Sequence, residues 1–112
     1  MKIKPASADL VKSILLSSVV PLQAIDIIHM AAKQHDTLIS PREIRLAVNW
    51  LRTQDELPFL LSGNSGYYIS SDEALIRKFE HRIKSQAIEQ FRICKAIRKQ
   101  LFEKLNSPIK FT

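Results

Sequence analysis

The sequence of 112 residues is poor in the residue types from which catalytic and metal sites are built. It holds one cysteine, Cys94, so neither an intrachain disulfide nor a cysteine zinc site can form. Its three histidines are isolated, and no nucleophile motif has a nearby partner. Two glycines leave no glycine-rich loop for phosphates. We therefore expect no catalytic site, no metal site and no cofactor.

The sequence also lacks a hydrophobic run long enough to span a bilayer, which takes ~18 residues. Residues 1–24 have early lysines and an uncharged stretch, as a secretory signal does. Asp9, Lys12 and Pro21 interrupt that pattern, so we expect a packed helix instead. Cys94 lies in an apolar stripe and is expected to be a small buried residue. The expected location is the cytoplasm, without a membrane partner.

The residues that are present form a globular and basic composition. Hydrophobic residues make up 46% and charged residues 25%, which fits one folded domain with a modest core. The formal net charge is +6, and most of it lies in residues 72–105. Polyanions are therefore the natural class of partner.

The N-terminal third predicts two helices and a short strand. Ser7 or Asp9 can cap a first helix, whose apolar positions recur at helical spacing from Leu10 to Leu15. Pro21 suits the first turn of a second helix, which runs to about Gln34. Residues 37–39 are expected to form a short extended strand.

Residues 41–54 predict a capped helix. Ser40, Pro41 and Glu43 form a capping box with proline at the first helical position, worth about 1 kcal/mol. One side of this helix is apolar. The neighbouring side carries a polar row, at spacings of three and four, formed by Arg42, Arg45, Asn49 and Arg52.

Residues 57–70 predict a β-hairpin. Two apolar, aromatic-rich runs flank Ser62-Gly63-Asn64-Ser65-Gly66, and glycine and asparagine tolerate the positive φ angles of a tight turn.

Residues 72–105 predict one long helix with an apolar stripe and a basic polar side. At 1.5 Å per residue it would be ~50 Å long, more than a core of this size can cover. A second copy of the chain is the simplest cover for the stripe, with a fold-back broken near Ser85 as the alternative. The expected dimer interface comprises Phe91, Cys94, Ile97, Leu101 and Leu105.

"ISPREIRLAVNWLR", "LPFLLSG" and "GYYIS" resemble segments of small phage and prophage winged helix-turn-helix proteins. The likeness covers residues 38–70. It implies a mainly α fold with a small β-hairpin: a winged-helix domain over residues 1–70, a long helix over 71–106 and a tail over 107–112. It departs from the family pattern at Phe59-Leu60-Leu61, which is more apolar than usual.

Two arrangements of the helix-turn-helix are open, because only one helix fits between residues 37–39 and the hairpin. Residues 22–34 supply the supporting helix and residues 41–54 the recognition helix, or the two usual helices have merged. We favour the first.

The expected function is regulatory binding of duplex DNA by a homodimer in the cytoplasm of a host bacterium. Arg45 and Asn49 would read base edges, while Arg42 and Arg52 would contact phosphates. The hairpin would lie over the DNA backbone with Ser62, Asn64, Ser65 and Tyr67. The alternative is a phage protein that binds and modulates a host replication, transcription or defence protein, for which exposed apolar residues such as Leu46 would serve.

Overall fold

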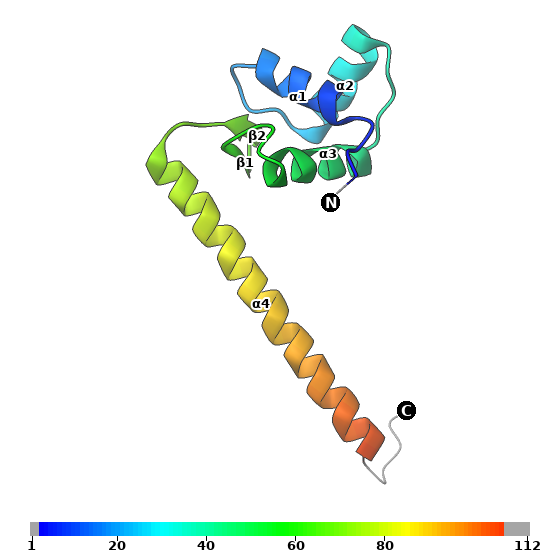
Figure 1. Cartoon of the computed structure of the whole chain (residues 1–112), viewed down its shortest axis with the longest axis vertical. Coiled ribbons are helices and arrows are strands. Elements are labelled where there is room, and N and C mark those ends of the chain that lie inside the picture. The colour runs from blue at the N-terminus through cyan, green and yellow to red at the C-terminus, as the bar shows by residue number, and fades with distance from the viewer. Residues whose placement is uncertain (1–2, 107–112) are drawn as a thin grey trace. The chain divides into compact units, whose positions relative to one another are not determined.

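A computed structural model describes residues 3–106, and the chain divides into two units, Met1–Ile76 and Arg77–Thr112 (Figure 1). The protein is mainly helical with one two-stranded antiparallel hairpin and a long C-terminal helix, as predicted. The predicted tail at 107–112 lies outside the described residues. The elements are α1 (Ala8–Ser17), α2 (Ala24–His35), α3 (Pro41–Thr53), β1 (Leu60–Gly63), β2 (Gly66–Ile69) and α4 (Glu73–Asn106).

The core of the first unit lies where α1 packs against α2, α3 and strand β2. Burial of each large aliphatic side chain contributes about 1.5–3 kcal/mol. The prediction of a packed N-terminal helix is confirmed, because one side of α1 is buried. The largest fully buried side chains are Val11, Ile14, Ile27, Ile44, Val48 and Leu51.

Helix α2 begins later than predicted. Pro21 precedes the helix, which starts at Ala24 with Gln23 at the N-cap position. The backbone amide of Gln23 donates to Oδ2 of Asp26 at 2.8 Å, so this cap depends on a glutamine and an aspartate three residues apart. The prediction of Pro21 in the first turn is wrong because the backbone of Leu22 is engaged elsewhere.

Leu22 forms an isolated antiparallel bridge with Tyr67 of β2. Each residue donates its amide to the carbonyl of the other, at 2.9 and 2.8 Å. The predicted strand at 37–39 is therefore wrong, since the extended segment that pairs with the hairpin lies before α2. Along the chain, two helices, α2 and α3, therefore lie between the bridging segment at Leu22 and the hairpin.

The hairpin has the predicted position and a two-residue turn. Strands β1 and β2 pair in the register Gly63 with Gly66 and Leu60 with Ile69, which leaves Asn64 and Ser65 at the tip. Gly66 has φ +114°, a region that favours glycine.

Helix α4 is continuous over its 34 residues. The backbone amide of Ala74 donates to Oδ1 of Asp72 at 2.9 Å, so Asp72 caps the N-terminal end of this helix. No break occurs near Ser85, where the alternative of a fold-back onto the N-terminal helices had placed one. Cys94 was expected to be buried, but its side chain is exposed in the single chain.

Candidate nucleic-acid interface

Helix α3 is held rigidly at its start and along its inner face. The amide of Glu43 donates to Oγ of Ser40 at 3.2 Å, and Oε1 of Glu43 accepts from the amide of Ser40 at 3.1 Å. The predicted capping box is thus confirmed. Ile44, Ala47, Val48 and Leu51 are buried. The opposite face of α3 is therefore fixed in position while it remains open to solvent.

The outer face of α3 carries Arg42, Arg45 and Asn49, all of which are exposed. Within residues 3–106, neither arginine forms an ion pair or a side-chain hydrogen bond. The nearest carboxylate in the sequence, that of Glu43, is committed to the helix cap. Exposed guanidinium groups of this kind, without an ion pair among residues 3–106, can bind an anion without first breaking an interaction within the chain.

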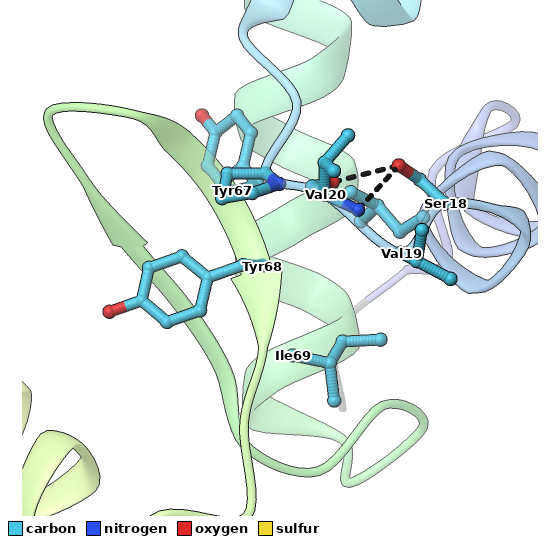
Figure 2. A pocket seen from close by; sticks show the side chains of 8 residues that line it. Ser18, Val19, Val20, Tyr67, Tyr68 and Ile69 are labelled. Atoms are coloured by element: carbon cyan, nitrogen blue, oxygen red, sulfur yellow. Dashed lines mark hydrogen bonds between the residues drawn. The ribbon is translucent and has the colours of Figure 1, made fainter.

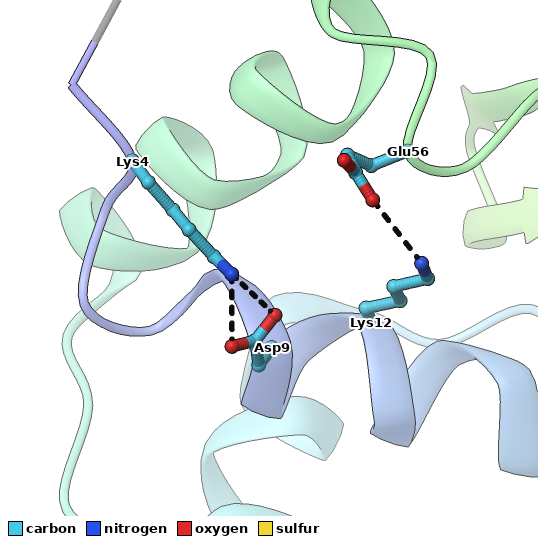
Figure 3. Close-up of polar contacts among 4 residues, drawn as sticks. All are labelled: Lys4, Asp9, Lys12 and Glu56. Carbon is cyan, nitrogen blue, oxygen red and sulfur yellow. Dashed lines mark hydrogen bonds and ion pairs between the residues drawn. The ribbon is translucent and has the colours of Figure 1, made fainter.

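Other carboxylates of this unit are already paired with lysines (Figure 3). Lys4 lies 2.9 Å from Oδ1 of Asp9, and Lys12 lies 3.5 Å from Oε2 of Glu56. Both pairs are largely exposed, so each contributes little to stability. These ion pairs matter for the charge of the surface. They neutralise two acids of the domain with lysines, so these acids do not neutralise the arginines of α3.

Arg52 differs from the other members of the predicted row. It is half-buried, and its Nε donates to the carbonyl of Leu60 in β1 at 2.7 Å. The hydrogen bond links the C-terminal end of α3 to the first strand of the hairpin. Arg52 therefore has a structural role, and its phosphate contact stays a prediction.

The hairpin is fixed to the helices at two further points. Nε2 of Gln23 donates to the carbonyl of Asn64 at 2.8 Å, which ties the tip of the hairpin to the start of α2. Tyr67 bonds through its backbone to Leu22, and its half-buried ring packs against the core. The predicted hairpin residues thus stand in two groups: Asn64 and Ser65 are exposed, while Ser62 and Tyr67 are half-buried.

Leu22 and Gln23 are positioning residues that sequence reasoning missed. Both lie in a segment expected to be helical, and both instead fasten the hairpin beside α2. The spacing of Gln23 and Asp26 could have indicated where α2 begins, since this pair caps the helix. The indication is weak because glutamine is an uncommon N-cap residue.

Trp50 is partly buried against the core, and Nζ of Lys4 lies 5.5 Å from the centre of its ring. Its indole nitrogen is buried without a hydrogen-bond partner among the described residues. Leu46, by contrast, is 50% exposed on α3, so part of the expected apolar surface is present.

An open cleft of about 420 Å³ lies between the α1–α2 connection and strand β2 (Figure 2). Oγ of Ser18 donates to the carbonyl of Val20 and accepts from its amide, which fixes the local backbone at this point. Val19 and Val20 are exposed on one wall, and Ile69 is partly exposed on the other. The cleft is mostly apolar and lacks a charged group.

Charge is distributed very unevenly along the chain. Residues 1–76 contain seven Lys and Arg against eight Asp and Glu, whereas residues 77–112 contain ten against three. The positive charge of α3 is therefore local, on a domain that is close to neutral. The basic character of the whole protein belongs to its C-terminal segment.

The predicted dimer-interface residues all lie on α4. Taken by itself, this helix buries none of its side chains, and Phe91, Ile97, Leu101 and Leu105 are each more than half exposed.

The residues that the structure describes provide neither a metal site nor a membrane-spanning helix. Within residues 3–106, no three His, Cys, Asp or Glu side chains gather closely enough to hold a metal ion. None of the helices described for the chain combines the length and hydropathy needed to cross a bilayer.

Comparison with models of known protein families, with curated proteins and with solved structures finds no match for this chain. The likeness to phage winged-helix proteins is carried by residues 38–70 alone and stays a prediction.

Proposed function

We propose that this protein is a regulatory winged helix-turn-helix protein of the phage type that binds duplex DNA. The observation that carries the proposal is the outer face of α3, where Arg42, Arg45 and Asn49 are exposed and unpaired by any carboxylate of residues 3–106. The order of elements supports it. A bridging segment at Leu22 is followed by two helices and then a hairpin, as in a winged helix.

In this proposal α2 is the supporting helix and α3 the recognition helix in the major groove. Arg45 donates two hydrogen bonds to guanine and Asn49 pairs with adenine, each contact adding about 1–3 kcal/mol of discrimination. Arg42 contacts a flanking phosphate. The hairpin tip, with Asn64 and Ser65, lies against the backbone, held at its position by Gln23 and Arg52.

The test is selection of duplexes from a random pool by the full-length protein, followed by fluorescence anisotropy on the selected site. We expect a defined sequence preference. Arg45→Ala or Asn49→Ala should lower the preference for the selected base about 5- to 150-fold, which corresponds to about 1–3 kcal/mol. Lys33→Ala is the matched control, since it removes an exposed charge from α2, and it should leave the preference unchanged.

Two results would contradict the proposal. One is selection that yields no consensus. The other is an equal loss of preference in Arg45→Ala and Lys33→Ala, because the face of α3 would then contribute charge alone.

The cleft beside β2 favours a second candidate function, the binding of a host protein. Its apolar wall with Val19 and Val20 would suit a partner better than a phosphate backbone, and residues 1–76 are close to neutral. This function predicts no DNA binding even at low salt. A host protein would co-purify with the wild type and be lost selectively in Val20→Asp, while Lys33→Asp would retain it.

A further inference from the structure

The apolar stripe of α4 is formed by residues at helical spacings of seven and four. These residues are Ile76, Ile83, Ala87, Cys94, Leu101 and Leu105. The stripe runs the full length of the helix, and Leu101 and Leu105 are 54% and 75% exposed. An apolar face of this length requires a cover of similar length.

The rest of the chain is too small to supply that cover. A helix of 34 residues is about 50 Å long, at 1.5 Å per residue. A unit of the size of Met1–Ile76 has a radius of gyration of about 11 Å and can cover only part of such a length. A second α4 matches the stripe along its whole length.

We propose that two copies of the chain pair through α4 in parallel and in register. The orientation follows from the charges that flank the stripe. At about 100° per residue, and between Ile76 and Leu105, the two sides of the stripe differ in charge. One flank carries four basic residues and a single acid, Glu80, beside two phenylalanines; the basic residues are Arg77, Lys84, Lys95 and Arg98. The other flank has Lys104 as its single charge, beside Phe79, Gln86, Gln90, Ile93 and Ile97.

Symmetry determines which flanks meet. In an antiparallel pair, equal flanks face each other, so Lys84 would lie opposite the region of Lys95 and Arg98 of the second copy. Like charges placed this way are unfavourable. In a parallel pair each basic flank faces the flank of the other copy that has Lys104 as its single charge. Parallel pairing thus lowers the repulsion while it buries the same apolar stripe.

Parallel pairing also has a consequence for the assembly. Because the N-terminal end of α4 belongs to the first unit, two parallel helices would join two copies of that unit at the same end of the pair. The inference itself rests on α4 alone, and it holds or fails independently of DNA binding.

The single cysteine of the chain is a natural reporter of the pairing, because Cys94 lies on the stripe. Light scattering on the full-length protein under reducing conditions should give twice the mass of 12.8 kDa at micromolar concentration. Leu101→Lys should return the protein to the monomer mass. Gln100→Lys, the same charge placed off the stripe, should remain a dimer. Fluorescence of Trp50 reports that the first unit stays folded in each variant.

Disulfide trapping then distinguishes the two orientations. In a Cys94→Ala background, Ile76→Cys alone and Leu105→Cys alone should each form a disulfide-linked dimer if the helices are parallel and in register. An antiparallel pair whose stripes overlap fully brings residue 76 of one copy to residue 105 of the other. In that case only a mixture of the two variants would cross-link efficiently. A strict monomer, or cross-linking confined to the mixture, would overturn the proposal.

Discussion

Gly66 lies where strand β2 passes closest to the segment that precedes α2. A Cβ added at this residue would stand 2.4 Å from the carbonyl carbon and oxygen of Leu22, and 2.7 Å from the amide nitrogen of Gln23. These are backbone atoms that cannot rotate away, and φ is +114°. Gly66→Ala is therefore expected to destabilise the first unit by at least about 1–3 kcal/mol. Urea denaturation followed by Trp50 fluorescence measures this loss.

Gly63→Ala is the matched control on the paired strand. Its added Cβ would meet only Cε1 of Tyr68, at the ordinary contact distance of 3.9 Å. Its stability should change little or rise by about 0.5–1 kcal/mol. Equal midpoints for the two variants would mean that β2 does not approach Leu22 as described.

Single residues show why part of the candidate interface could be predicted from the sequence. Arg42, Arg45 and Asn49 follow from helical spacing, because spacing alone places them on the face opposite the buried residues. The bond from Arg52 to the carbonyl of Leu60 joins two elements across a loop, and no periodicity encodes it. Sequence patterns identify which side of a helix is exposed, but they do not reveal which exposed group is committed to a neighbouring element.

At the scale of the element, the reciprocal cap of α3 determines how firmly the recognition face is held. Ser40→Ala removes the acceptor for the amide of Glu43, a bond of 3.2 Å, and should lower the free energy of unfolding by about 1 kcal/mol. The same denaturation measurement applies. Ser13→Ala, an exposed change inside α1, is the control and should be neutral or slightly stabilising, since alanine favours helix. A loss no larger than that of Ser13→Ala would show that the cap contributes nothing.

Elements whose ends are set by local chemistry could be predicted closely. The start of α3 at Pro41, the two-residue turn of the hairpin and the cap of α4 at Asp72 each depend on residues within four positions of one another. The start of α2 could not be predicted in this way, because Leu22 pairs with a residue of β2 that lies 45 positions later in the chain. A bridge between residues so far apart in the chain does not alter the hydrophobic periodicity of either segment. Pro21, just before the bridge, instead suggests a helix that begins too early.

At the scale of the whole molecule, we expect base reading and phosphate-dependent affinity for DNA to depend on different parts of the chain. Residues 1–76 are close to neutral and carry the polar face of α3, whereas residues 77–112 hold ten basic residues against three acids. Affinity that depends on phosphates varies with salt, while base reading depends on hydrogen-bond geometry. Salt dependence and sequence preference should therefore be separable by substitution.

Lys84 and Lys95 provide the test of this separation, because both are exposed and neither forms an ion pair within residues 3–106. Lys84→Gln combined with Lys95→Gln should weaken binding to selected and mixed-sequence duplexes by the same factor. If both lysines contact phosphates, the slope of log K against log salt should fall in magnitude by about 2. Asn49→Ala should do the reverse, lowering preference for the selected site with little change in slope. Lys33→Gln controls for the loss of charge elsewhere. An unchanged slope in the double variant would mean that the positive charge of α4 serves another partner.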